Sequence, residues 1–260
     1  MVSDQPRLKI GQLLQKTGMW RASRLDYDWQ KGIATGFARL DRELAGSGWP
    51  ADGLTELLHD QPGIGEFRLL APALAQLSQT QARWILMISP PYLPYAPALA
   101  GAGIDLSRVL VVEPNTRADM LWVLEKAIGS RSCSAVLAWP RGIREKEIRR
   151  LQVASKEGQC TSILFRPGRD ARQSSPAELR LQIFATTASS MSDHTRLEIR
   201  ILKRRGGWAT SSFCISFEDN LNLATPDYSE ITVERPQPPE LPTPVNRNRR
   251  KEIICDLKLS

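Results

Sequence analysis

The strongest constraint on the fold is an alternation of short apolar runs and amphipathic runs that starts at Leu54. Apolar runs occupy residues 54–58, 84–89, 109–113, 135–139 and 162–165. Short, continuous apolar runs are typical of strands that are buried on both faces. The runs between them carry apolar residues at helical spacing, over 67–77, 116–128 and 144–157. The sequence therefore predicts an α/β fold with a mostly parallel central sheet.

The pattern changes after Pro176. Residues 179–186 and 196–202 alternate apolar and polar side chains, and a third short run, 213–217, follows the glycine pair at 206–207. Strict alternation is typical of strands with one exposed face. We expect these segments to form antiparallel strands at the carboxyl-terminal end of the core.

Outside the core, composition separates two further segments. Residues 1–32 contain apolar side chains at roughly helical spacing over 8–20, which predicts an N-terminal helix and linker. Residues 33–220 form the predicted core. Residues 221–260 form a predicted disordered tail with five prolines in 235–244, a basic cluster at 247–251 and an apolar end. No apolar run reaches the length of a membrane span and no signal peptide opens the chain, so we expect a cytoplasmic protein.

The chain is basic and poor in metal-binding residues. Its 260 residues carry a formal net charge of +7, which favours either an anionic partner or a solvated basic surface. The four cysteines are far apart and contain no C-x-x-C pair, and only two histidines are present. We expect neither disulfides nor a metal site.

The loop after the first predicted strand has the outline of a phosphate-binding loop without its chemistry. Such a loop needs the pattern G-x-x-x-x-G-K-[ST], in which Lys binds the phosphates and the hydroxyl binds Mg²⁺. Gly63 and Gly65 are present, but Glu66 replaces the Lys and Phe67 replaces the Ser or Thr. A carboxylate beside a triphosphate repels it. These four residues predict a degenerate phosphate loop.

The order of segments over 33–217 resembles RecA-type NTPases. The stretch AGID at 102–105 and the following strand are similar to the recombinase, and several strings are similar to the ImuA family, whose members are RecA-like proteins of bacterial translesion synthesis. These strings are DQPGIGE (60–66), SPPYLPYAP (89–97), AVLAWP (135–140) and LKRRGG (202–207). The resemblance implies a RecA-like P-loop NTPase core with a degenerate nucleotide site. Part of the ImuA family is also similar to the SulA cell division inhibitor, so the resemblance extends to SulA.

Other positions that the resemblance assigns to ATP chemistry also lack the expected groups. Pro90 and Pro91 stand where the acid that activates water is expected, and Pro140 follows the strand that would carry the Mg²⁺ aspartate. Arg166 replaces the polar sensor. We therefore expect no catalytic residues, no cofactor and no enzymatic activity, with a weak, DNA-binding residual ATPase as an alternative.

Two basic clusters are candidate contacts with DNA or protein. The loop at 168–175, where the recombinase has a DNA-binding loop, holds Arg169 and Arg172, and the second cluster is Lys203, Arg204 and Arg205. A solvated turn is the alternative for the second cluster. We expect DNA contact to be weak.

The tail is a candidate partner-binding module, because a proline-rich spacer precedes basic and apolar residues. Its candidate contacts are Arg247, Arg249, Arg250, Lys251, Ile253, Ile254, Leu257 and Leu259. The ImuA resemblance implies a nucleoid-associated accessory protein of damage-induced mutagenesis. Its implied partners are the polymerase-like ImuB, RecA itself and an error-prone DnaE-type polymerase. The alternative function is that of a SulA-like inhibitor acting on the tubulin-like division protein.

Overall fold

The computed structural model describes residues 32–186, 196–207 and 209–218. All of them belong to Met1–Thr225, the first of the two units into which the chain divides. The predicted N-terminal helix at 8–20 and the predicted tail at 221–260 lie outside the described residues. Those two predictions therefore stay predictions.

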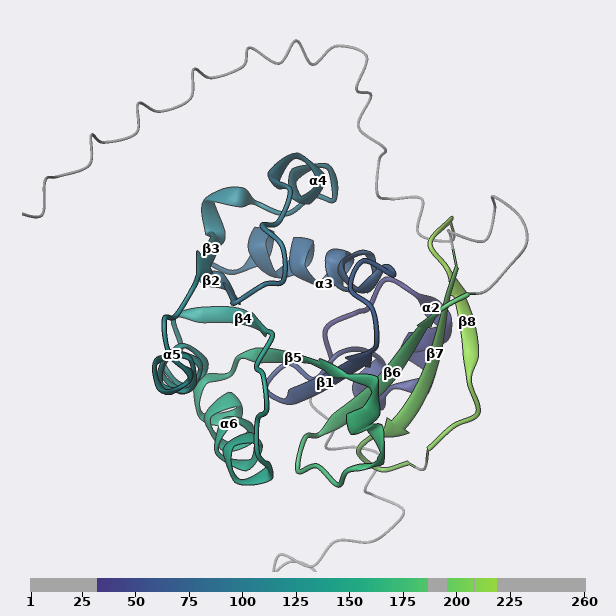
Figure 1. Ribbon diagram of the computed structural model, residues 1–260. Helices are drawn as coiled ribbons and strands as arrows, with labels where there is room; N and C mark the ends of the chain where they lie inside the picture. The colour runs from purple at the N-terminus through teal and green to yellow at the C-terminus, as the bar shows by residue number, and fades with distance from the viewer. Residues whose placement is uncertain (1–31, 187–195, 208, 219–260) are drawn as a thin grey trace, which may run out of the picture. The chain divides into compact units, whose positions relative to one another are not determined.

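The central element is an eight-stranded mixed sheet with the strand order β3-β2-β4-β5-β1-β6-β7-β8 (Figure 1). The strands from β3 to β6 in that order pair in parallel, and β7 and β8 continue the sheet in antiparallel pairing. The strands are β1 (Leu54–His59), β2 (Trp84–Ile88), β3 (Val109–Val112), β4 (Cys133–Ala138), β5 (Thr161–Pro167), β6 (Leu179–Ala185), β7 (Arg196–Lys203) and β8 (Phe213–Ser216).

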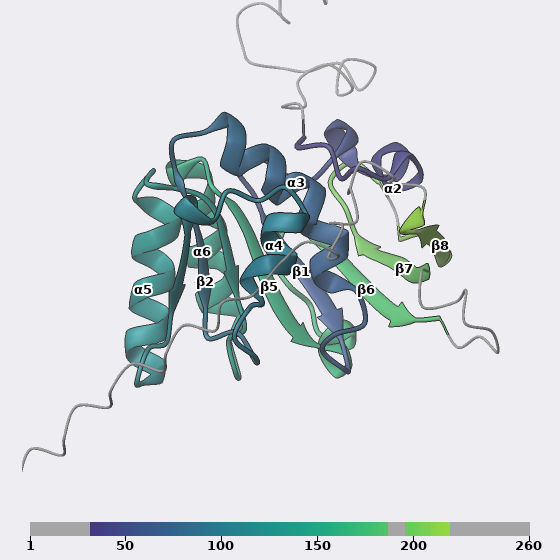
Figure 2. The same cartoon turned by 90° about the horizontal axis from the view of Figure 1, so that it is seen from above.

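Helices cover both faces of this sheet. Figures 1 and 2 show α3 and α4 on one side, and α5 and α6 on the other. The α-helices are α2 (Ala38–Glu43), α3 (Glu66–Thr80), α4 (Ala96–Gly101), α5 (Arg117–Gly129) and α6 (Glu145–Gly158). Short 3-10 turns are η2 (Ala45–Ser47), η3 (Leu106–Arg108) and η4 (Gly168–Arg172).

Local sequence signals explain where the helices on the second face begin. The Thr116 hydroxyl accepts a hydrogen bond from the Asp119 backbone N–H at 3.1 Å, which caps α5. The Glu147 carboxylate accepts one from the Arg144 backbone N–H at 2.8 Å at the start of α6. The Arg117 side chain donates to Glu147 at 2.7 Å, so the first turns of the two helices are joined.

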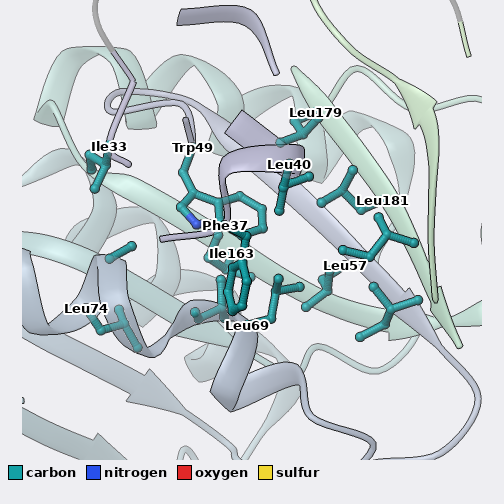
Figure 3. Close-up of a cluster of buried hydrophobic side chains, with 14 of the residues drawn as sticks. Ile33, Phe37, Leu40, Trp49, Leu57, Leu69, Leu74, Ile163, Leu179 and Leu181 are labelled. Carbon is teal, nitrogen blue, oxygen red and sulfur yellow. The ribbon is translucent and has the colours of Figure 1, made fainter. Parts of the chain in front are cut away.

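The apolar core lies in two layers, one on each face of the sheet. On the first face, Trp49 and Phe37, which precede β1, pack with Leu57 of β1 and Leu69 of α3 (Figure 3). On the second face, Leu124 of α5 and other residues of α5 and α6 form a cluster with the alternate residues of β2, β4 and β5. Side chains on a strand point alternately to opposite faces, so each strand contributes to both layers.

The strands and most helices lie where the sequence predicts them. The expected strands at 54–58 and 84–89, for example, are Leu54–His59 and Trp84–Ile88. The sequence did not predict α4, because the four prolines of 89–97 indicate an extended segment. Pro97 nevertheless lies in the first turn of α4, where a missing N–H costs nothing.

No helix in the described part of the chain combines the length and the apolar character that a bilayer crossing requires. Nor do any three of the described His, Cys, Asp and Glu side chains gather in a way that could hold a metal ion.

Candidate interaction surface

The loop between β1 and α3 is closed by its own carboxylate. Glu66 accepts hydrogen bonds from the backbone N–H groups of Gly63, at 2.7 Å, and Gly65, at 3.1 Å. Both glycines have positive φ angles, 84° and 114°, which turn these N–H groups inward. Glu66 is 4% exposed. The four predicted residues lie in this loop, but two of its backbone donors, the N–H groups of Gly63 and Gly65, are already occupied by Glu66.

Aromatic rings fill the space beside this loop at the carboxyl ends of the parallel strands. The Trp139 ring stacks on Phe165 with centroids 4.2 Å apart and planes 4° apart. Phe67 lies 5.8 Å from Trp139 and 6.3 Å from Phe165. Such stacked rings contribute packing energy beyond their buried area. The position that a nucleotide and its metal would need is therefore occupied by apolar side chains.

The histidine at the carboxyl end of β1 has few hydrogen-bond partners. His59, at the end of β1, is buried, and its Nδ1 lies 2.9 Å from the Gln61 carbonyl oxygen. Its Nε2 has no hydrogen-bond partner among the described residues. Within the same residues, no hydroxyl or thiol hydrogen-bonds to His59, so the geometry contains no nucleophile activated by this base.

Among the described residues, the most exposed large apolar side chains lie in the segment that joins β2 to α4. Tyr92 is 74% exposed, Leu93 is 84% and Tyr95 is 67%. We call these three residues the aromatic segment. Ser89, which follows the last residue of β2, has a positive φ of 52°, and this left-handed conformation turns the chain away from the strand.

The aromatic segment is stiffened by its composition. Pro90, Pro91, Pro94 and Pro97 each fix φ and restrict the residue before them. An exposed apolar surface on a stiff backbone loses little conformational entropy when it is buried by a partner. Contiguous exposed apolar residues of this kind mark interaction sites. The aromatic segment is therefore the best candidate contact surface on the described part of the chain.

The neighbouring edge of the sheet is also apolar. β3 is the edge strand, and its residues Leu110 and Val111 are 43% and 40% exposed. β3 pairs with β2, which leads into the aromatic segment. Trp122, on α5, is 63% exposed as well, but it lies in the groove between α5 and α6 with Glu125 and Arg150. Trp122 is therefore an exposed aromatic residue that can serve as a control for Tyr92 and Tyr95.

The two predicted basic clusters behave differently. Arg169 and Arg172 are both exposed on η4. Lys203 instead donates to the Ser175 carbonyl at 2.8 Å, and Arg204 pairs with Glu43 at 3.0 Å. Arg205 lies 3.7 Å from Glu178.

The environment of the second cluster changes the pKa of Lys203. Burial, and then the positive charge of Arg180, lowers the pKa of Lys203 below its ordinary value. All three cations of this cluster have partners within the domain, so their charge is partly balanced, while Lys203 and Arg205 stay exposed to solvent. The candidate tail contacts at 247–259 lie outside the described residues.

Comparisons with known proteins match this chain to SulA, the alternative to the ImuA interpretation, and not to ImuA or RecA. A family model described as "Cell division inhibitor SulA" matches residues 54–162. A SulA division inhibitor from Cronobacter sakazakii is 31% identical over 147 residues, covering 54% of this chain and 86% of that protein. One from Photorhabdus laumondii is 30% identical over 113 residues, covering 44% of this chain and 63% of that protein. The crystal structure of SulA from Pseudomonas aeruginosa is 30% identical, with a TM-score of 0.39, covering 46% of this chain and all of that one.

These matches overturn the ImuA and RecA interpretation. The assignment as a RecA-like P-loop NTPase core is wrong: the family match is to SulA, and the mixed sheet carries Glu66 and an aromatic stack where such a core binds nucleotide. The predicted role in translesion synthesis and mutagenesis is also wrong, because the matched relatives are named as division inhibitors. The predicted partners ImuB, RecA and the DnaE-type polymerase lose their basis with it.

Sequence reasoning did not identify the aromatic segment as a surface. The signal was present in the string at 89–97, which alternates prolines with large apolar residues and fits neither helical nor strand spacing. It also did not predict that Glu56, in an apolar strand, pairs with Arg166 and Arg180. Charged residues inside runs that otherwise indicate buried strands were the available signal.

Proposed function

The chain belongs to the SulA family of cell division inhibitors, and on this premise we propose that it inhibits cell division by binding a protein of the division machinery. The observation that carries the proposal is the 31% identity to a named division inhibitor over 86% of that protein's length. We infer that the target is the tubulin-like division protein and that the location is cytoplasmic. The proposed mechanism is non-enzymatic: the chain acts by occupying a surface of its target.

The geometry supports a binding mechanism for three reasons. The donors of the β1–α3 loop are occupied by Glu66, and stacked aromatic rings fill the adjoining space. The buried His59 has no hydroxyl or thiol partner in the described part of the chain. The aromatic segment, in contrast, presents three large apolar side chains on a stiff backbone. Buried aromatic anchors dominate the energetics of protein interfaces.

The aromatic segment is therefore proposed as the anchor of the contact with the target. Binding would bury Tyr92, Leu93 and Tyr95 and remove their apolar surface from water. Each fully buried side chain of this kind contributes about 1.5–3 kcal/mol. Replacing all three with serine removes this term while leaving the buried core untouched, since none of the three is buried.

Induced expression in a rod-shaped bacterium tests the proposal, with cell length as the measurement. We expect the wild-type chain to produce filamentous cells and to reduce sedimentation of polymers of the purified tubulin-like division protein. The Tyr92→Ser, Leu93→Ser, Tyr95→Ser variant should lose both effects. Trp122→Ser, which removes an aromatic of similar exposure from α5, should keep them.

Circular dichroism of each variant establishes that it is folded. The proposal would be abandoned if the folded wild-type chain left both cell length and polymer sedimentation unchanged. If the wild type acts and the triple variant acts equally well, the inhibitor function stands and the aromatic segment is not its anchor.

A further inference from the structure

A buried network of charged residues lies on the face of β1, β5 and β6. Glu56 of β1 is fully buried, and its two carboxylate oxygens accept from Arg166 Nη1 and Arg180 Nε, both at 2.6 Å. The Ser175 hydroxyl donates to the same carboxylate at 2.8 Å. Arg166 and Arg180 are each 5% exposed. These three charged side chains keep their positions, because separating them would leave a buried charge without a counter-charge.

The same two arginines hold the connection between β5 and β6. Arg166 donates to the Asp170 carboxylate at 2.9 Å. Arg180 donates to the backbone carbonyls of Gln173, at 2.8 Å, and Asp170, at 3.0 Å. The 3-10 turn η4 and the residues after it are thus fixed to the sheet through charged hydrogen bonds. We call residues 168–175 the anchored loop.

The anchored loop presents two positive charges side by side. In a 3-10 helix, side chains three residues apart lie one above the other, and η4 contains Arg169 and Arg172 at this spacing. Both are exposed. The carboxylate between them in sequence, Asp170, points inward and pairs with Arg166.

Neither arginine is neutralised by the residues around it. Asp60 lies against the backbone of Gly168. Within the described residues, neither Asp60 nor any other carboxylate forms a salt bridge with Arg169 or Arg172. Like charges three residues apart on a helical turn repel each other, and an anion between them relieves the repulsion. Guanidinium groups bind carboxylates through two parallel hydrogen bonds.

The charges lie along the same edge of the sheet as the aromatic segment. β2, β4 and β5 are neighbouring parallel strands, so the loops after their carboxyl ends emerge at one edge. These loops carry the aromatic segment, then the exposed Arg141, then Arg169 and Arg172. Two strand spacings separate the first from the last, which is about 10 Å.

We propose that Arg169 and Arg172 form a clamp for carboxylates of an acidic segment in the protein that the aromatic segment binds. This proposal rests on the proposed function. It specifies the partner's binding site as apolar residues next to a cluster of Asp or Glu. The partner's apolar residues bury the aromatic segment, and its carboxylates pair with the clamp. Charge pairs at the rim of an interface raise the association rate and fix the orientation of the partner.

The arrangement fits a protein better than a nucleic acid. A nucleic-acid groove needs cations spread along the track of the backbone. Here the second basic cluster, Lys203, Arg204 and Arg205, is engaged within the domain. The open charges of Arg169 and Arg172 lie on one short turn, and the exposed Arg141 lies on the neighbouring loop. This local group matches a cluster of carboxylates.

Binding of the purified tubulin-like division protein to the full chain, measured by biolayer interferometry at 50, 150 and 300 mM NaCl, tests the clamp. We expect Arg169→Ser, Arg172→Ser to raise Kd about tenfold at 50 mM NaCl and to flatten its salt dependence, since rim charges are screened by salt. The control is Lys126→Ser, Lys156→Ser, which removes two exposed cations from the last turns of α5 and α6. It should match the wild type.

The outcomes separate the two proposals. If the wild type binds and the Arg169, Arg172 variant binds equally at every salt concentration, the clamp is wrong and the proposed function stands. If the wild type does not bind, both fail. Fluorescence anisotropy with a 20-nucleotide single strand forms the last arm. Loss of oligonucleotide binding in the variant with unchanged protein binding would overturn the carboxylate clamp in favour of a nucleic-acid contact.

Discussion

The face of the sheet that carries α5 and α6 is filled in two different ways. Over β2 and β4, and next to Leu54 of β1 and Leu164 of β5, Leu124 and its neighbours on the two helices bury an apolar surface. Towards the carboxyl ends of β1 and β5 and on β6, the same face carries Glu56, Arg166 and Arg180 under the anchored loop. A helix supplies enough apolar side chains to seal a sheet, whereas a short loop does not. In this sheet, paired charges take the place of a hydrophobic layer where a short loop is the cover.

The two halves also differ in what they position. The apolar half is non-directional, because hydrophobic contacts depend on area and not on angle. The charged half fixes the anchored loop through hydrogen bonds of defined geometry, from Arg166 and Arg180 to Asp170 and Gln173. We therefore expect the first half to contribute stability and the second to contribute the placement of Arg169 and Arg172.

The largest expected effect comes from Glu56→Gln. This change leaves Arg166 and Arg180 buried without their common counter-charge, at a cost of about 4 kcal/mol in the free energy of unfolding. Urea denaturation followed by circular dichroism measures it. Asp170→Asn is the control, because Asp170 is partly exposed and water can replace its charge, so its cost should be clearly smaller.

A combined variant sharpens the same prediction. Glu56→Leu, Arg166→Met, Arg180→Met replaces the whole network with apolar groups, and such replacements are often neutral or stabilising. We expect stability near that of the wild type but loss of the clamp effect, because the anchored loop no longer has its donors. A combined variant as unstable as Glu56→Gln would contradict the proposed division of roles.

Leu124→Ala should have the next largest effect. Leu124 is fully buried in the apolar half, and its truncation removes transfer energy and leaves a cavity, at a cost of about 3 kcal/mol. The same urea experiment applies. Binding to the division protein should be unchanged once the variant is folded, and weaker binding would show that the apolar half also positions the contact surface.

The sequence predicts most of the architecture, because apolar spacing is a local property. The predicted strands at 84–89 and 135–139 and the predicted helix at 144–157 correspond to β2, β4 and α6, because the runs and the spacing of apolar residues can be read directly from the chain. The ImuA assignment was wrong because it relied in part on a local pattern, the glycine loop after the first strand. The glycines of 63–65 shape a similar turn in many proteins, so the outline of a loop does not identify what it binds.

The candidate surface was harder to predict, because exposure and pairing depend on residues far apart in sequence. Arg169 and Arg204 look alike in the sequence, yet one is exposed and the other pairs with Glu43. Glu56 and Arg166 are 110 positions apart. Only the pairing of β1 with β5 brings them together, and no local pattern encodes that register.

The smallest expected effect concerns the buried thiol of the apolar half. Burial, reinforced by the nearby Cys133, raises the pKa of Cys160 from 9.0 to about 12. The folded state therefore keeps this proton at a pH where the unfolded state loses it. The stabilising effect is complete below pH 9 and is lost as the pH rises from 9 towards 12.

Wild-type protein should lose about 1 kcal/mol more unfolding free energy between pH 7.5 and pH 10 than Cys160→Ala, as one proton is linked to unfolding. Urea denaturation at the two pH values measures the difference. Cys214→Ala, at an exposed thiol of β8, is the matched control and should lose as much as the wild type. Equal losses in the wild type and Cys160→Ala would mean that water reaches Cys160, and that the apolar layer under α5 and α6 is not sealed at this residue.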